Sequence, residues 1–334
     1  MERDPYSRCG IETIGGKGKI FITGEVTSKA QFNVEDVVKS VLEEVGYSTN
    51  YEIINNIGQQ SSDIAQGVDT GGAGDQGMMF GYACRDIENG IPLAMYILQC
   101  LAMSYDTLRE RDTRFLPDGK AQITGCYNDK GKLIYIKDFV VSYQNTEIDR
   151  EDTDRIIKER CLKMCHEYDI AVEQFHFNPT GKFLIGGFEG DSGLTGRKIC
   201  VDNYHSFAPV GGGAFSGKDP TKVDRSATYK ARQIALECLN EHPEVNNVLV
   251  QLSYAIGLSK PMAIYIKTDK GIVEPWDDLY RECEPKNIID DLNLRNIKYR
   301  HTAQYGHFGV HRGYPKEIFK TFVPWEDEIK IVNN

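Results

Sequence analysis

Three glycine-rich stretches carry most of the residues whose types and spacing could do chemistry. They span residues 71–81, 186–198 and 211–225. Glycine lets the backbone approach a ligand and aim its N–H groups at phosphate oxygens. Each stretch also carries an acid, and the second and third carry several Lys and Arg residues. Turns would explain the glycines of any one stretch, but three such stretches together indicate a ligand site.

The charges of the second and third stretches suit a polyphosphate. From Asp191 to Arg232 the chain holds seven Lys or Arg and four Asp or Glu, a local +3, whereas the whole chain carries −10. Cations pair with phosphate oxygens, and carboxylates bind Mg²⁺. We therefore expect a magnesium polyphosphate as the ligand.

The third stretch contains a near match to the P-loop. Residues 212–218 fit G-x-x-x-x-G-K, but Asp219 stands where a Ser or Thr must reach Mg²⁺. Pro220 follows at once, where a P-loop needs an immediate helix. An ordinary P-loop kinase is therefore not expected.

Two longer motifs lie within these stretches, Gly-Ala-Gly-Asp-Gln-Gly at residues 72–77 and Gly-Gly-Gly-Ala-Phe-Ser-Gly-Lys-Asp at residues 211–219. Shorter segments accompany them in order along nearly the whole chain: Glu12-Thr13, Gly24-Glu25, Gln60-Ser61-Ser62-Asp63-Ile64, Pro117-Asp118-Gly119-Lys120, Asn178-Pro179-Thr180-Gly181, Leu194-Thr195-Gly196-Arg197-Lys198 and Tyr305-Gly306-His307-Phe308-Gly309. On these residues the chain resembles the S-adenosylmethionine synthetases, or methionine adenosyltransferases. Members of that family join the adenosyl group of ATP to the sulfur of L-methionine and hydrolyse the released triphosphate to pyrophosphate and phosphate.

The resemblance implies a role for each matching residue. Catalytic contacts are implied for Lys120, Arg197, Lys198, Lys218 and Asp191. ATP contacts are implied for Asp75, Asp118, Lys120, Lys182, Phe183, Asp191, Arg197, Lys198, Ala214 and Lys218, and methionine contacts for Glu25, Gln60, Asp191 and Lys222. The implied metal ligands are Glu12 for K⁺ and Asp224 in the Mg²⁺-dependent site. Residues 60–71 match a mobile loop that covers the site and excludes water.

The chain departs from the family pattern in three places. Lys182 stands where Arg is usual, and Asn145 where His is common. Family chains also carry a Gly-His-Pro-Asp-Lys segment ahead of the Glu12-Thr13 match, whose His assists triphosphate departure and whose Asp binds Mg²⁺. Here Met1 begins just ahead of that match, and His242-Pro243 continues with Glu instead of Asp-Lys. Two hypotheses therefore stay open: an active synthetase, or a truncated, catalytically impaired or regulatory nucleotide-binding relative.

Composition narrows the possible partners. A pI near 5.3 argues against a nucleic-acid or anionic-membrane binder. The longest apolar stretch, residues 91–103, is too short to span a bilayer, and no signal peptide is visible. Nine scattered cysteines indicate reduced thiols in a cytoplasm. Cys161 and Cys165 are interpreted as buried helix thiols, and His307 as structural.

The elements that must position these residues alternate along the chain. Apolar periodicity predicts helices at residues 34–45, 92–109, 150–168 and 225–242. It predicts strands at residues 19–26, 121–127, 132–143, 247–256 and 262–268. This order favours an α+β fold with helices on one face of mixed or antiparallel sheets.

The resemblance adds the arrangement of these units. It implies three similar α+β domains around a pseudo-threefold: an N-terminal domain at residues 1–68, truncated at its start, a central domain at 75–188 and a C-terminal domain at 189–327. It also implies a homodimer or dimer of dimers that packs through sheet faces, with active sites between subunits.

Overall fold

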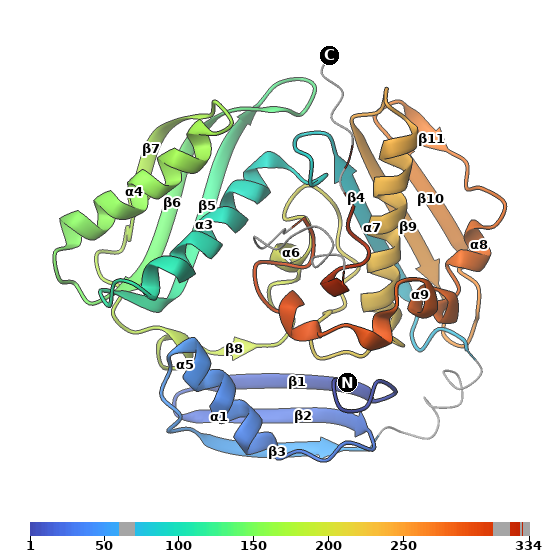
Figure 1. The fold of residues 1–334 in the computed structure, drawn as a ribbon, viewed down its shortest axis with the longest axis horizontal. Coiled ribbons are helices and arrows are strands. Elements are labelled where there is room, and N and C mark those ends of the chain that lie inside the picture. The colour runs from blue at the N-terminus through green and yellow to red at the C-terminus, as the bar shows by residue number, and fades with distance from the viewer. Residues whose placement is uncertain (60–70, 310–320, 328, 330–334) are drawn as a thin grey trace.

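The computed structural model describes residues 1–59, 71–309, 321–327 and 329. Within these residues the strands form three sheets, and each sheet is covered by helices. Figure 1 shows the three units around a central region that contains the short helix α6 (Ile199–Asp202). The expected α+β class is confirmed.

The N-terminal unit is a four-stranded sheet under one helix. Its strand order is β3-β2-β1-β8, from β1 (Arg8–Gly16), β2 (Lys19–Thr27), β3 (Glu52–Gly58) and β8 (Gly193–Leu194). Helix α1 (Val34–Val45) begins where the Asn33 side chain accepts from two backbone N–H groups, and it ends at Gly46 with a φ of 94°. Its apolar stripe meets Ile20 and Ile22 of β2.

The second unit forms the upper left of Figure 1. Its sheet has the order β5-β6-β7, from β5 (Phe115–Tyr127), β6 (Leu133–Asn145) and β7 (Ala171–Phe177). Strands β5 and β6 pair antiparallel, and β6 and β7 pair parallel across α4 (Arg150–His166). Helix α3 (Leu93–Arg109) packs beside α4. Cys161 and Cys165 are fully buried, which agrees with their interpretation as packing residues.

The third unit is an antiparallel sheet of order β11-β10-β9-β4. It contains β4 (Gly77–Cys84), β9 (Asn247–Tyr254), β10 (Ala263–Thr268) and β11 (Gly271–Val273), with α7 (Val223–Glu241) across it. A Cβ at Gly81 would lie 2.1 Å from the Ala231 carbonyl oxygen of α7. The expectation that the glycines of residues 71–81 serve a ligand is therefore wrong for Gly81, because this glycine lets the helix backbone touch the strand.

Short helical elements lie between and after the strands of these units. They are α5 (Gly187–Gly190), α8 (Leu279–Glu282), α9 (Pro285–Asp291) and two 3₁₀ turns, Leu294–Asn296 and Tyr299–Thr302. The last described segment is held by Arg232 of α7, which is fully buried and donates to the Glu326 carboxylate at 2.7 Å.

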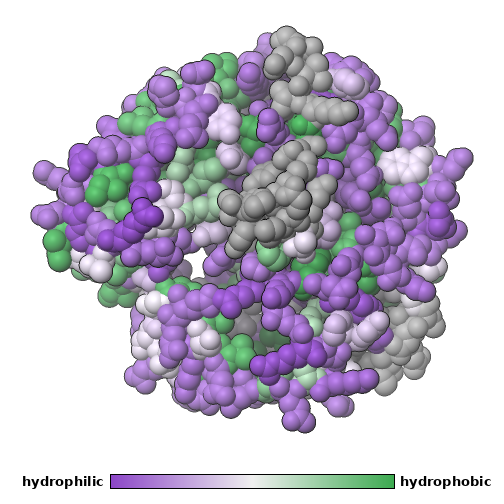
Figure 2. All heavy atoms as spheres, in the orientation of Figure 1, coloured by the Kyte–Doolittle hydropathy of each residue, from purple (hydrophilic) through white to green (hydrophobic). Residues whose placement is uncertain are grey.

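The surface of the molecule is largely polar on the face drawn in Figure 2. Figure 2 shows one face that is mostly hydrophilic, with hydrophobic residues in scattered groups. In the part of the chain that the structure describes, no helix is long and apolar enough to cross a membrane.

Candidate active site

Strand β1 brings the second and third glycine-rich stretches together. Along one edge it pairs with β2, and along the other it meets both stretches. The 193–195 segment bonds to Thr13, where the Thr195 N–H donates to the Thr13 carbonyl at 3.0 Å. Further along the same edge, Gly10 bridges Lys218. Periodicity did not predict this strand, which contains three glycines, so its organising role was missed.

Asp219 builds the loop that carries the two predicted lysines. Its carboxylate is fully buried and accepts from the N–H groups of Cys9 and Thr221, each at 2.8 Å. Burial, and secondarily the Asp219 carboxylate, raise the pKa of the Cys9 thiol to about 11. The residue that breaks the P-loop pattern therefore joins the loop to β1.

Two ion pairs join four of the predicted site residues. Lys218 Nζ lies 2.6 Å from Asp224 Oδ2, with the side chains 22% and 15% exposed. Lys222 Nζ lies 3.6 Å from Glu25 Oε1. Thus Lys218, a predicted ATP contact, faces Asp224, a predicted metal ligand. The two predicted methionine contacts, Lys222 and Glu25, also face each other.

Glycines let the three stretches pack directly on one another. A Cβ at Gly196 would lie 2.7 Å from the Ala214 Cβ, and one at Gly211 would lie 2.0 Å from the Met78 carbonyl oxygen. A Cβ at Gly213 would lie 2.3 Å from the Asp224 carboxylate. These glycines bring predicted ATP contacts from separate stretches to one place. Their role here is to let two segments of the backbone pack closely together.

The start of the second stretch is fixed by β5 and β6. Asp118 Oδ2 accepts from the Gly187 N–H at 3.0 Å. The Gln144 amide accepts from the Asp118 N–H at 3.2 Å and donates to the Leu184 carbonyl at 2.9 Å. Phe183, a predicted ATP contact, accepts from the Asn145 N–H through its carbonyl at 3.0 Å. Gln144 was missed as a site residue, and no spacing signal in the sequence marks it.

The remaining predicted residues are mostly exposed. They are Glu12, Asp75, Lys120, Lys182, Asp191, Arg197 and Lys198. Arg197 and Asp191 both bond the Ser192 backbone, at 3.3 and 2.8 Å. Within the described part of the chain, Asp75, Lys120 and Lys198 form no hydrogen bond or ion pair with Lys218 or Asp224. Gln60 and residues 61–70 of the predicted covering loop lie outside the described residues.

The described residues contain no group of three His, Cys, Asp or Glu that could hold a metal by themselves. In a site where Mg²⁺ is bound to a polyphosphate, the protein need supply only one or two carboxylates, because phosphate oxygens and water complete the shell. Asp224 could supply a carboxylate of this kind. Glu12 on β1 presents an exposed carboxylate, a hard oxygen donor that suits an alkali cation.

Family models and curated relatives identify the family. The model of the N-terminal domain of S-adenosylmethionine synthetase matches residues 1–65, that of the central domain residues 70–183 and that of the C-terminal domain residues 185–321. The S-adenosylmethionine synthase of Sulfurovum sp. (strain NBC37-1) is 41% identical over 334 residues, covering 92% of this chain and 86% of the relative. Those of Clostridium tetani and Kosmotoga olearia are 40% and 39% identical, covering 92% and 98% of this chain and 87% and 91% of the relatives. The chain belongs to the S-adenosylmethionine synthetase family.

Proposed function

We propose that this protein is a methionine adenosyltransferase, which forms S-adenosylmethionine from ATP and L-methionine and hydrolyses the triphosphate to pyrophosphate and phosphate. The observation that supports the proposal is the presence of two ion pairs, Lys218–Asp224 and Lys222–Glu25, near the edge of β1 where the family motifs meet. All three domain models match, and the relatives cited above share the synthase name. A regulatory or impaired relative is not favoured.

The chemistry needs positive charge that is held in place. The methionine sulfur forms a bond to the ribose C5′ while the C5′–O bond breaks, so negative charge grows on the departing triphosphate. Lys218 would stabilise this charge by moving its ammonium from Asp224 to a phosphate oxygen, which leaves the Asp224 carboxylate for Mg²⁺. When bound, Mg²⁺ would neutralise part of the triphosphate charge.

The second ion pair matches the two charges of a free amino acid. Glu25 can accept the methionine ammonium, and Lys222 can pair with its carboxylate. Their separation of 3.6 Å shows that the two charges already face each other across β2 and the start of α7. We assign Gln60 and Asp191 to the same methionine site by the family match.

The other family positions complete the proposed site. ATP contacts are assigned to Asp75, Asp118, Lys120, Lys182, Phe183, Asp191, Arg197, Lys198 and Ala214, and K⁺ to Glu12. The domain boundaries 1–68, 75–188 and 189–327 and a cytoplasmic location belong to the same proposal.

A second copy of the chain is the proposed partner. On the sheet face opposite α7, Met78, Tyr265 and Ile272 are 50%, 39% and 63% exposed. Burial of such a face against its own copy would remove apolar surface from water. We expect a homodimer or dimer of dimers at micromolar concentration. A light-scattering mass of one chain across that range would refute the shared site.

The test of the activity is direct. The purified protein, with ATP, L-methionine, Mg²⁺ and K⁺, should form S-adenosylmethionine, measured by mass spectrometry. Lys218→Met should lower kcat about 10²–10³-fold. Lys39→Met is the matched control, because Lys39 also forms a 2.6 Å ion pair, in this case with Glu35 on the exposed face of α1. This variant should leave kcat unchanged. No product from the parent chain would overturn the function, and a near-parental Lys218→Met would remove Lys218 from the site.

A further inference from the structure

The loop that carries Lys218 and Lys222 is called the lysine loop. A single buried guanidinium connects it to the C-terminal part of the chain. Arg225, in the first turn of α7, is 3% exposed. Its Nη1 donates to the Lys218 carbonyl at 2.6 Å, its Nε to the Tyr229 hydroxyl at 3.2 Å and its Nη2 to the Thr302 hydroxyl at 3.3 Å. Tyr229 lies one turn further along α7, whereas Lys218 and Thr302 lie outside the helix, so one planar group links the loop, the helix and the 3₁₀ turn.

The connection continues beyond the guanidinium. The Arg225 Cζ lies 4.1 Å from the centre of the Tyr299 ring, in the same 3₁₀ turn as Thr302. The Tyr229 hydroxyl lies 2.7 Å from His307 Nδ1. Its ring stacks on Trp325 at 3.6 Å between centroids, and the Trp325 indole donates to the His307 carbonyl. His307, interpreted from the sequence only as structural, is therefore part of a buried chain that ends at the lysine loop.

The contact with Lys218 restrains one peptide from both sides. Arg225 holds the Lys218 carbonyl, and the next residue, Asp219, is held to Cys9 through its N–H group and its carboxylate. With this peptide plane fixed, the direction in which the Lys218 side chain leaves the backbone is fixed as well. A lysine at position 225 would keep the charge but lose the planar fork that reaches three acceptors.

We propose that Arg225 is a positioning residue for the synthetase reaction, which aims Lys218 at the triphosphate and makes that aim depend on the docking of residues 299–309. The inference rests on the proposed function only in taking the triphosphate as the ligand of Lys218. Arg225 itself touches the backbone of the loop, so its effect on the reaction passes through Lys218.

The kinetic test uses Arg225→Lys and a double variant. Arg225→Lys should lower kcat at least 10-fold while the ATP KM changes less than about threefold, because an interaction made in the transition state is lost. In a Lys218→Met background the same change should lower kcat less than about twofold, since no lysine remains to be aimed. Equal losses in both backgrounds would overturn the proposal, as would a kcat within threefold of the parent for Arg225→Lys alone.

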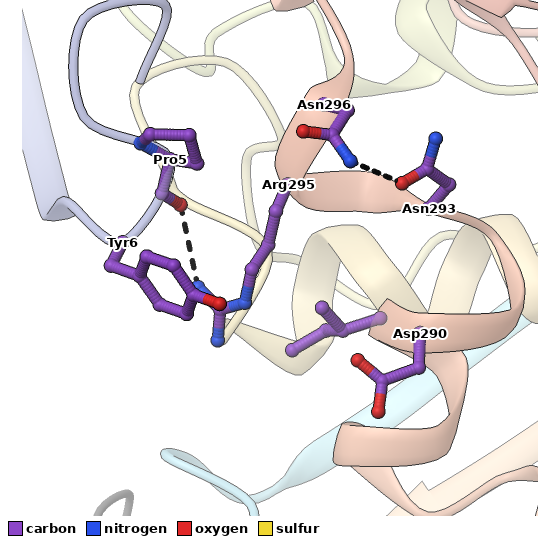
Figure 3. A pocket seen from close by; sticks show the side chains of 7 residues that line it. Pro5, Tyr6, Asp290, Asn293, Arg295 and Asn296 are labelled. Carbon is purple, nitrogen blue, oxygen red and sulfur yellow. Dashed lines mark hydrogen bonds between the residues drawn. The ribbon is translucent and has the colours of Figure 1, made fainter.

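Arg295→Lys is the matched control. The Arg295 guanidinium also lies over a tyrosine ring, 4.6 Å from the centre of Tyr6, and donates to the Pro5 carbonyl at 3.4 Å. Figure 3 shows this pair lining a pocket together with Asp290, Asn293 and Asn296. The same substitution there should leave kcat unchanged.

A second measurement, the rate of Lys218 acetylation, reports on the lysine loop and does not require enzymatic turnover. Brief acetylation of each folded variant, followed by peptide mass spectrometry, should modify Lys218 at least fivefold faster in Arg225→Lys than in the parent, with Lys39 as the internal reference. If the parent forms no S-adenosylmethionine, the function fails and this labelling still decides the role of Arg225. Should Arg225→Lys not fold, Thr302→Val removes one acceptor and should raise Lys218 labelling in the same direction. Unchanged labelling in the folded variants would overturn the proposal.

Discussion

The two charged glycine-rich stretches of the site are held in very different ways. In residues 211–225 the acid Asp219 is fully buried and Arg225 is 3% exposed, and both bond the backbone around Lys218. In residues 186–198 the charged side chains of Asp191 and Arg197 are exposed, and a two-residue strand, β8, joins the stretch to β1. One half of the site is therefore held by buried charges, whereas the charges of the other half are exposed. Preorganised charge suits the stabilisation of a departing triphosphate.

The largest expected effect is on the free energy of unfolding, when one aspartate of each stretch is replaced by alanine. Asp219→Ala should lower the free energy of unfolding by about 4 kcal/mol, because two buried N–H groups lose a charged acceptor. Asp191→Ala should change it by less than about 0.5 kcal/mol, because Asp191 is exposed and bonds the adjacent Ser192 N–H. Denaturant unfolding of the two variants measures the difference. Similar losses at both positions would show that residues 186–198 are as firmly built as the lysine loop.

Two glycines of the lysine stretch sharpen the same point. Gly217 has a φ of 89°, and a Cβ there would lie 2.1 Å from the Ile11 carbonyl oxygen. Gly212 has a φ of 97° but nothing within 4 Å of such a Cβ. Gly217→Ala should cost about 3 kcal/mol and Gly212→Ala about 1 kcal/mol, since only the first adds a clash with β1 to the cost of the left-handed backbone. Thermal melts of both variants provide the check, and equal costs would contradict close packing on β1.

Thiol reactivity compares the stretches without a mutation. Cys9, beside Asp219, has its pKa raised to about 11 by burial, whereas Cys200 follows the second stretch and is exposed. At pH 8 iodoacetamide should label Cys200 roughly 100-fold faster than Cys9, because the thiolate is the reactive form. Raising the pH to 9 should speed Cys9 labelling about tenfold, since its thiolate fraction grows tenfold per pH unit below its pKa. In urea the two rates should converge, and equal rates in the folded protein would contradict the partial burial of Cys9.

The smallest expected effect concerns the link between the second stretch and β1. Thr195→Val removes the hydroxyl that accepts from the Thr13 N–H at 3.0 Å but leaves the Thr195 N–H bond to the Thr13 carbonyl. It should cost about 1 kcal/mol of unfolding free energy. Thr107→Val, on the exposed face of α3, keeps the same shape and should cost less than about 0.5 kcal/mol. A larger loss at Thr195 would mean that β8 holds more of the fold than its two residues suggest.

The sequence by itself determined the four long helices α1, α3, α4 and α7 and the charged character of the glycine-rich stretches. The helix at residues 34–45 follows from local periodicity, and the structure places its cap residues at Asn33 and Gly46. The strands at residues 19–26, 247–256 and 262–268 were also predicted close to their observed bounds. Motifs of adjacent residues identified the family and predicted that Lys218 and Lys222 contact the phosphates or the methionine.

Only the tertiary structure decided how Lys218 and Lys222 are held in place. Strand β1 is rich in glycine, and strand β4 begins inside a glycine-rich stretch, so neither shows a strong local strand pattern. Asp219 and Arg225 were read as motif charges, yet their partners, Cys9 and Thr302, lie 210 and 77 residues away along the chain. A buried charge is stable only where distant backbone groups converge to satisfy it, and that convergence depends on the packing of the whole chain rather than on any local pattern.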